Sequence, residues 1–274
     1  MKIIKRRLFF DIEVSPNVGI FWTAGFKLNV GYDSILKERA IICICYKWEH
    51  EKTVHSLTWD KKQCDKAMLK RFAKIAEDAD ELVGHNGDNF DLKWIRTRCI
   101  FHKIKFTPFI KTIDTLKIAR SLFRFNSNKL DYIGQFLGVG GKISITYSLW
   151  KDVMNKDAKA LAYMVKYCKI DVKRLESVFL KLEDYAPIKT HYGVKNGRAK
   201  RSCPKCGHEH TVINNTRISA AGIVKIQLKC KKCGRLHQVP ASAIKNVFTT
   251  TERRTTRTIY KRTRTKIKAR TRRK

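Results

Sequence analysis

The sequence predicts an α/β fold in which a mixed β-sheet is flanked by helices, followed by a small module with four cysteines and by a basic tail. Three observations support this prediction. Strand-like apolar runs come first, helix-spaced apolar positions then alternate with short strands, and two C-x-x-C pairs stand near the C-terminus. Strands followed by helix–strand alternation indicate a mixed sheet with helices on its faces.

Strands are predicted where β-branched and aromatic residues cluster between polar turns. The first covers residues 8–14 and ends before Ser15-Pro16, and a polar turn joins the next two, at residues 39–48 and 53–59. Beyond these strands, helical spacing of apolar residues predicts four helices, and two short apolar runs between them predict strands. These are, in order, a helix over 64–79, a strand over 81–83, a helix over 91–101, a strand over 109–113, a short helix around 132–137 and a long helix over 157–182.

Residues 16–38 fit no regular element, although they contain the aromatic residues Phe21, Trp22, Phe26 and Tyr32. Aromatic side chains in a loop can stack on nucleic-acid bases. More often they pack the loop against its own domain, and we expect that arrangement here. The segment is therefore predicted to be a loop held down by its aromatic side chains.

The chain is strongly basic, and its basic residues are unevenly placed. Its 274 residues include 59 Lys or Arg and 24 Asp or Glu, which gives a formal net charge of +35. Residues 185–274 hold 25 of the basic and 2 of the acidic residues. Such a surplus indicates a polyanionic partner, and nucleic acid is the expected one. The sequence shows neither a membrane-spanning run nor a secretory signal, so we expect a cytoplasmic location and no membrane partner.

A domain boundary is predicted where the charge changes and the long helical pattern ends, near residues 184–187. The tail has 12 basic residues and one acidic residue with almost nothing to bury, so it is expected to be disordered. The predicted segments are a first domain at 1–184, a linker at 185–197, a cysteine module at 198–248 and a basic tail at 249–274.

Several acidic residues lie where apolar residues are expected. Strand alternation places Asp11 and Glu13 on one face of the first strand. Asp171 falls within the apolar stripe of the long helix, with Tyr167 one turn before it. Asp91 opens a helix and, taken alone, would be assigned as a helix cap. Buried carboxylates are costly without a compensating cation. Two divalent metals in a basic protein suggest cleavage of phosphodiesters.

These segments resemble the three motifs of DnaQ-like 3′–5′ exonucleases of the DEDDy subclass, as found in the proofreading domains of family-B DNA polymerases. The resemblance covers residues 6–183 and extends to predicted exonucleases carried by bacteriophages. The matching residues are Asp11 and Glu13 in the D-x-E motif, Asn86, Phe90 and Asp91 in the N-x-x-x-F-D motif, and Tyr167 and Asp171 in the Y-x-x-x-D motif.

The resemblance implies an RNase H-like fold and a two-metal mechanism with Mg²⁺ or Mn²⁺. Asp11 would bridge both ions. Glu13 and Asp171 would complete the site of the ion that activates water, and Asp91 would support the second ion. Mg²⁺ suits sites made of a few carboxylates and substrate oxygens.

The resemblance also implies that Tyr167 orients the attacking water and that Asn86 and Phe90 bind the substrate. The expected activity is removal of nucleotides from a free 3′ end, with DNA favoured. Two alternatives stay open, namely a transposase-type endonuclease of similar fold and a nucleic-acid-binding protein without catalysis. Partners in replication or repair are not specified by the sequence.

The C-terminal cysteines form two knuckles, each a C-x-x-C pair followed by glycine, and 23 residues separate the two pairs. Two such knuckles can bring four thiolates into a tetrahedral Zn²⁺ site, and the following glycine permits positive φ. Four protein ligands leave no open position, so the site is predicted to be structural. The intervening residues suit a β-hairpin, and the two knuckles together with this hairpin predict a zinc ribbon. Because this part of the chain is strongly basic, the ribbon is expected to hold the nucleic-acid backbone. The predicted zinc ligands are Cys203, Cys206, Cys230 and Cys233.

Overall fold

The computed structural model describes residues 3–23, 25, 30–106, 110–140 and 145–244. The chain divides into two compact units. The larger contains residues 5–189, and the described residues of the smaller are 190–244 together with Ile3 and Ile4. The basic tail predicted at residues 249–274 lies outside the described residues.

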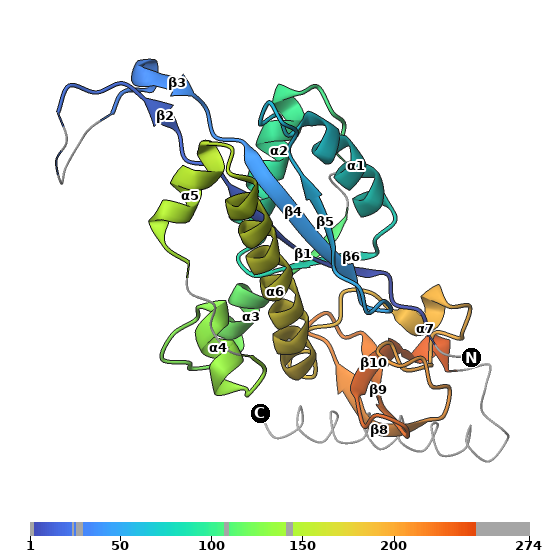
Figure 1. Ribbon diagram of the computed structural model, residues 1–274. Helices are drawn as coiled ribbons and strands as arrows, with labels where there is room; N and C mark the ends of the chain where they lie inside the picture. Colours follow the sequence, from blue (N-terminus) through green and yellow to red (C-terminus); the bar gives the residue numbers. More distant parts are fainter. Residues whose placement is uncertain (1–2, 24, 26–29, 107–109, 141–144, 245–274) are drawn as a thin grey trace, which may run out of the picture. The chain divides into compact units, whose positions relative to one another are not determined.

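The larger unit is built on a five-stranded sheet with the order β5-β4-β1-β6-β7 (Figure 1). Strand β1 (Arg7–Val14) lies at its centre, antiparallel to β4 (Ile41–Trp48) and parallel to β6 (Glu81–Gly84). The outer strands are β5 (His55–Thr58), antiparallel to β4, and β7 (Lys111–Asp114), parallel to β6. This arrangement confirms the predicted mixed sheet.

Two helices cover one face of this sheet (Figure 1). They are α1 (Lys66–Glu77) and α2 (Asp91–Phe101). Alternate residues of β1, including Leu8 and Phe10, form a buried cluster with the apolar faces of both helices. The ring centroid of Phe72 on α1 lies 5.7 Å from that of Phe10.

The long helix α6 (Ala158–Leu182) crosses the opposite face of the sheet, where it packs on β1 and β4 (Figure 1). Asp157 caps its first turn by accepting hydrogen bonds from two backbone N–H groups. Three shorter helices pack beside it, and only the second was predicted from the sequence. They are α3 (Thr115–Leu122), α4 (Leu130–Phe136) and α5 (Tyr147–Met154).

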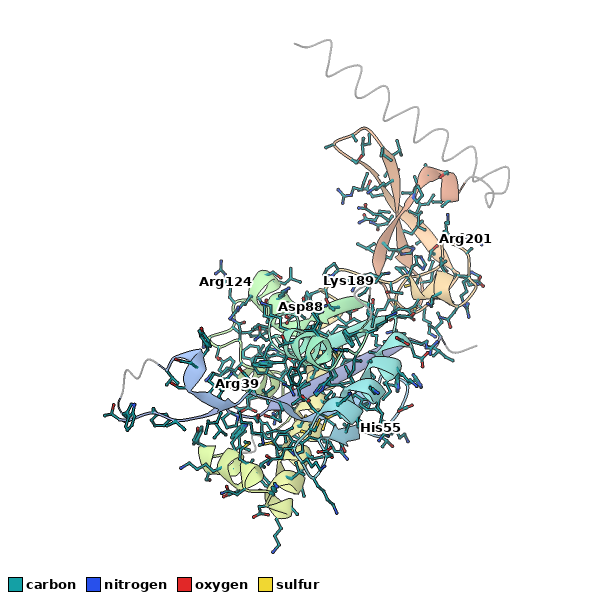
Figure 2. The ribbon with its side chains drawn as sticks, turned by 90° about the horizontal axis from the view of Figure 1, so that it is seen from above. Arg39, His55, Asp88, Arg124, Lys189 and Arg201 are labelled. Atoms are coloured by element: carbon teal, nitrogen blue, oxygen red, sulfur yellow. The ribbon has the colours of Figure 1, made fainter. Side chains whose placement is uncertain are left out.

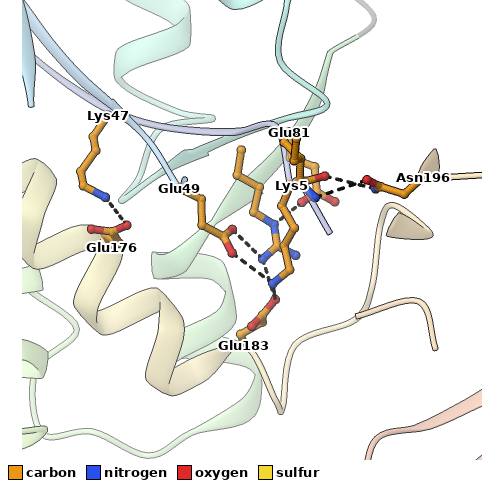
Figure 3. A network of polar contacts seen from close by, with 9 residues as sticks. Lys5, Lys47, Glu49, Glu81, Glu176, Glu183 and Asn196 are labelled. Carbon is orange, nitrogen blue, oxygen red and sulfur yellow. Dashed lines mark hydrogen bonds and ion pairs between the residues drawn. The ribbon is translucent and has the colours of Figure 1, made fainter. Parts of the chain in front are cut away.

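A buried ion-pair network joins the start of β1 to the end of α6 (Figure 3). Arg7 donates from Nε to Glu81 at 2.6 Å and from Nη1 to Glu183 at 2.5 Å. Lys5 contacts Glu183 at 3.3 Å and Glu49 at 3.1 Å. Because Glu81 is fully buried, its charge depends on this basic partner for compensation.

An arm of residues 15–39 leaves the sheet directly after β1 (Figure 1). Its root is closed by two hydrogen bonds of 2.9 Å, from the Ser15 N–H to the Ala40 carbonyl and from the Ala40 N–H to the Ser15 hydroxyl. Within it, β2 (Val18–Gly19) pairs with β3 (Ile35–Lys37), after a 3₁₀ helix at Tyr32–Ser34. A short paired ribbon therefore replaces the loop that was expected.

The aromatic side chains of this arm are exposed to solvent. Phe21 is 54% exposed, Tyr32 is 88% exposed and Trp22 is fully exposed. Phe26 lies outside the described residues. The prediction that these rings hold the segment down on the domain is therefore wrong, because the ribbon is fixed at its root and not by its aromatic side chains.

The smaller unit contains a three-stranded antiparallel sheet with the order β10-β9-β8, in place of the expected hairpin. Helix α7 (Tyr192–Lys195) lies within the predicted linker, and Tyr192 is fully buried. The Tyr192 N–H donates to the Pro204 carbonyl at 3.0 Å, which joins α7 to the first cysteine knuckle. The strands are β8 (Thr211–Ile218), β9 (Val224–Cys230) and β10 (Leu236–Pro240), followed by a 3₁₀ helix at Ala241–Ala243.

Candidate active site

Strand β1 carries two of the predicted site residues at the middle of the sheet. Asp11 and Glu13 are partly buried and lie opposite Cys45 and Cys43 of β4 in the antiparallel register. Residues two apart on a strand project from the same face. Both carboxylates therefore project from the face that α6 covers.

Asp91 reaches this strand from the first turn of α2. Its carboxylate is almost fully buried, and its Oδ1 accepts a hydrogen bond from the Ile12 N–H at 3.2 Å. Phe90, the residue before the helix, makes no side-chain cap. Asp91 therefore does more than cap its own helix, because it bonds to the strand between Asp11 and Glu13.

The last two predicted residues lie on α6. The Tyr167 hydroxyl hydrogen-bonds to the carboxylate of Asp171 one turn later. The Arg174 guanidinium donates to Asp171 Oδ1 at 2.6 Å. The thiol of Cys168, beside Tyr167, lies 3.5 Å from the Asp11 carbonyl oxygen and fixes this turn of the helix against β1.

The four carboxylates are close enough to repel one another, and this repulsion adds to burial in raising the pKa values of Asp11 and Glu13. Burial, followed by the charges of Asp91, Glu13 and Asp171, raises the pKa of Asp11 well above its ordinary value. Burial and then the charges of Asp171 and Asp91 raise the pKa of Glu13 to about 8. Burial raises the pKa of Asp91 to about 7, and it also raises the pKa values of Asp171 and Tyr167. The site is thus an excess of negative charge in a poorly solvated place.

The loop that carries the second motif is held in place by a carboxylate at the end of β7. Asp114, at the end of β7, accepts hydrogen bonds from the Asn86 N–H at 2.9 Å and the Asp88 N–H at 3.4 Å. It also caps α3. Figure 2 labels Asp88, whose carboxylate pairs with Lys117 at 2.7 Å. Asp114 therefore sets the path of the chain that leads to Asp91.

The two predicted substrate residues lie on this same loop. Asn86 has a φ of 64°, a value that Asn tolerates better than most residues. Its carbonyl accepts the Phe90 N–H at 2.9 Å, which closes the turn before α2. Phe90 is 40% exposed and so offers a ring face to solvent beside the buried Asp91.

The oxygen donors around β1 could hold hard divalent cations. In the part of the chain that the structure describes, these carboxylates do not form a set of three ligand atoms all within 4.8 Å of one another. Mg²⁺ rarely needs such a closed set, because one or two carboxylates with substrate phosphate oxygens usually hold it. Burial and mutual repulsion disfavour the ionised form of these carboxylates, and a bound cation would stabilise that form, so the donor set fits such ions.

The four C-terminal cysteines meet in the smaller unit. The Cys206 sulfur lies 3.6 Å from that of Cys230 and 3.5 Å from that of Cys233, and the Cys203 and Cys233 sulfurs are 3.6 Å apart. Sulfurs at about 2.3 Å from a tetrahedral Zn²⁺ are separated by roughly 3.8 Å. The thiols could therefore hold one such ion with little movement.

Both knuckles have the same backbone geometry. The Gly207 N–H donates to the Cys203 carbonyl at 2.7 Å, and the Gly234 N–H donates to the Cys230 carbonyl at 3.0 Å. The two glycines have φ values of 65° and 73°. Each C-x-x-C-G segment therefore turns tightly enough to direct both of its sulfurs inward.

Two further groups contain sulfur ligands. Cys43, Cys45 and Cys168 are buried behind the carboxylate site with their sulfurs within 4.8 Å of one another. Cys64, Asp65 and His102 form the second group. Asp65 already accepts hydrogen bonds from the Arg98 guanidinium and the Ile41 N–H, so its carboxylate has a structural role.

The layered mixed sheet, with carboxylates at its centre and a long helix across one face, defines an RNase H-like α/β domain. A family model described as the RNase_H superfamily matches residues 8–183. The match covers more than half of the chain, which therefore belongs to the RNase H superfamily. Among the residues that the structure describes, no helix is long and apolar enough to span a membrane.

The chain is also similar to parts of known DNA polymerases. It is 39% identical over 77 residues to a DNA polymerase of Thermococcus hydrothermalis, covering 24% of this chain and 4% of that protein. It is 33% identical over 102 residues to a DNA polymerase of Thermococcus sp. (strain 9oN-7), covering 36% and 12%. The chain thus spans a small fraction of the length of these relatives.

A solved structure shares the fold. The family B DNA polymerase from the hyperthermophilic archaeon Pyrobaculum calidifontis superposes with a TM-score of 0.52 at 16% sequence identity. The match covers 65% of this chain and 24% of that one. At this level of identity the likeness concerns the fold alone.

Proposed function

We propose that the protein is a metal-dependent 3′–5′ exonuclease that hydrolyses phosphodiester bonds at nucleic-acid 3′ ends, with DNA favoured as the substrate. The observation that carries the proposal is the convergence of Asp11, Glu13, Asp91 and Asp171 on the central strand, with Tyr167 bonded to Asp171. Membership of the RNase H superfamily and the similarity to DNA polymerases support it.

The four carboxylates would hold two Mg²⁺ or Mn²⁺ ions. When bound, such ions activate water and neutralise charge on the attacking and leaving oxygens of an in-line displacement. The protein fixes the ligands beforehand, since Asp11 and Glu13 lie on the central strand and Asp171 on a helix packed against it. Tyr167 donates to Asp171 and would orient the attacking water. Asp91, held by the Ile12 N–H, would support the second ion.

The remaining residues would hold the substrate. Asn86 and Phe90 lie on the loop that leads to Asp91, and the exposed ring of Phe90 would stack on the terminal base. The cysteine module would bind one structural Zn²⁺ through Cys203, Cys206, Cys230 and Cys233. Its basic side chains would contact phosphates with little sequence preference. The predicted phage origin and cytoplasmic location stay predictions.

Degradation of a 5′-labelled single-stranded DNA in Mg²⁺ or Mn²⁺ tests the proposal. We expect wild type to give a ladder that shortens from the 3′ end, and Asp171→Asn to give none. Asp152→Asn is a matched control, because this carboxylate is exposed on α5 and is expected to leave the ladder intact. A circular single strand should resist cleavage. Its linearisation would instead indicate an endonuclease, and binding without cleavage of DNA or RNA would contradict catalysis.

A further inference from the structure

Arg174 is a buried cation beside the candidate active site. It lies on α6 three residues after Asp171, and only 5% of its side chain is exposed. One atom, Nη1, contacts two carboxylates, Oδ1 of Asp171 at 2.6 Å and Oδ1 of Asp131 on α4 at 3.0 Å. A single guanidinium nitrogen therefore links α4 to the third motif.

The path of the Arg174 side chain is fixed by close packing against α4. A Cβ atom added to Gly134 would lie 3.1 Å from Arg174 Cδ and 3.2 Å from its Cγ. These distances are shorter than ordinary contacts between carbon atoms. The aliphatic part of Arg174 therefore fills the space that the absent side chain of Gly134 leaves, and its head has little freedom to turn.

The contact also fixes the Asp171 carboxylate. Oδ1 accepts the guanidinium hydrogen bond, so Arg174, together with the Tyr167 hydroxyl, restricts the rotation of the carboxylate. The positive charge opposes part of the negative charge gathered at the site. Asp131 in turn opposes part of the charge of Arg174, because both carboxylates share Nη1.

We propose that Arg174 is a positioning residue that orients Asp171 and moderates the metal affinity of the site, and that Asp131 sets the strength of this effect. The proposal rests on the proposed function, because it assigns Asp171 to metal binding. A purely structural link between α4 and α6 would affect stability alone. The positioning role and a purely structural link therefore differ in what they predict for metal binding.

Loss of the Arg174 charge and loss of the Asp131 charge should change the metal affinity of the site in opposite directions. Arg174→Met removes the cation that competes for Asp171, so a divalent ion should bind about tenfold more tightly, while turnover falls because the carboxylate is no longer oriented. Asp131→Asn removes one of the two carboxylates that share Nη1, so more of the charge of Arg174 acts on Asp171 and the ion should bind about threefold more weakly. Arg174→Lys keeps the charge and should stay within about twofold of wild type in metal affinity.

The experiment is a titration of Mn²⁺ into the zinc-loaded full chain without nucleic acid, with unbound Mn²⁺ followed by electron paramagnetic resonance. Tighter binding in Arg174→Met together with weaker binding in Asp131→Asn supports the proposal. Equal affinities, or losses of affinity in both variants, overturn it. If Arg174→Met fails to fold, Asp131→Asn and Arg174→Lys decide, and unchanged binding in Asp131→Asn overturns the proposal.

Asp11→Asn separates this inference from the function on which it rests. If Asp11→Asn leaves Mn²⁺ binding unchanged, the carboxylate site does not hold the metal and both proposals fail. If Asp11→Asn abolishes binding while Arg174 and Asp131 variants match wild type, only the positioning role fails. A parallel measurement of kcat and KM should show that Arg174→Met lowers kcat with little change in KM.

Discussion

The backbone N–H of Ile12 donates to Asp91 Oδ1 at 3.2 Å, which attaches the start of α2 to the central strand. Ile12 stands between Asp11 and Glu13. One hydrogen bond therefore sets the distance between the second motif and the first. The bond also explains why a group that resembles a helix cap in the sequence is buried against a strand 79 residues away.

Asp91→Asn should stabilise the metal-free protein and impair catalysis. Asparagine keeps an oxygen acceptor for the Ile12 N–H but removes a charge from a crowded group of carboxylates. We expect a stability gain of about 1 kcal/mol, equal to roughly 2–4 °C in Tm for a unit of this size. Cleavage should fall by at least about a hundredfold, as for the loss of a fixed electrostatic group.

Thermal melting in magnesium-free buffer and single-turnover cleavage measure the two effects of Asp91→Asn. Asp152→Asn is the control, since this carboxylate is exposed on α5 and its change should alter neither quantity by much. A lower Tm for Asp91→Asn would contradict the claim that charge repulsion outweighs the hydrogen bond.

The stability of the metal-free protein should depend on pH through Glu13. Its pKa is raised to about 8 in the folded state, whereas unfolded Glu has a value of about 4.3. A raised folded pKa contributes stability that is fully present below about pH 4 and is lost as the pH rises through about 8. Binding of Mg²⁺ requires the ionised carboxylate, so the Tm increase caused by Mg²⁺ should grow over the same range.

Melting of wild type and Glu13→Gln from pH 5 to 9, with and without Mg²⁺, checks this dependence. Other groups also titrate in the chain, so the informative quantity is the difference between the two proteins. Wild type should lose stability relative to Glu13→Gln as the pH rises. Parallel curves would show that Glu13 does not hold a proton in the folded state.

Loss of one cysteine from the C-terminal module should unfold the smaller unit alone. Its buried apolar cluster consists of few residues, too small to stabilise a sheet without help from a metal. Cys206→Ser should reduce bound zinc from one ion per chain to nearly none. The cluster residues are Ile226, Leu228, Val239 and Ile244.

Metal analysis by mass spectrometry and limited proteolysis check this expectation. Cleavage should appear within residues 190–244 of Cys206→Ser, while residues 5–189 stay resistant. Cys99→Ala is the matched control, because this thiol lies in the larger unit, outside the groups of possible metal ligands among the described residues, and its loss is expected to leave the zinc content unchanged. Retention of a full zinc ion by Cys206→Ser would rule out a four-cysteine site.

Arg7→Met should strongly destabilise the larger unit. The substitution leaves Glu81 without its 2.6 Å partner in a fully buried position, a change that typically costs about 3–5 kcal/mol. The double variant Arg7→Met/Glu81→Leu removes both charges and should recover part of this loss, because Glu183 still lacks its 2.5 Å contact with Arg7. Urea unfolding measures both, and equal losses in the single and double variants would show that the pair itself has little part in stability.

The sequence predicted the residues whose signal is local. Asp171 stood out because it interrupts an apolar helical stripe, and Asp11 and Glu13 because they share one face of an apolar strand. The role of Asp131 could not be predicted this way, since its partner Arg174 lies 43 residues away and the two meet only through packing of α4 on α6. Arg174 could have been recognised from the sequence as a partner of Asp171, because residues three apart on one helix are neighbours.

The exposure of the arm could not be predicted for a similar reason. Aromatic residues such as Trp22 usually pack inward, and hydrophobicity gives no sign that two hydrogen bonds between Ser15 and Ala40 hold the arm at its root. The role of Asp114 could not be predicted from the sequence, because its single carboxylate both caps α3 and accepts hydrogen bonds from the loop before Asp91. Its second role depends on the pairing of β6 with β7.

The central position of β1 means that the carboxylate site is disrupted only by unfolding of the domain and not by local opening. Residues 8–14 pair with β4, and residues 7–9 also pair with β6, so the paired amides can exchange with solvent only when the sheet opens. The arm that follows β1 has few such bonds and can open alone. Amide hydrogen exchange should therefore differ sharply across Ser15, fast beyond it and as slow as global unfolding before it. The carboxylates of β1 keep their positions until the domain itself unfolds.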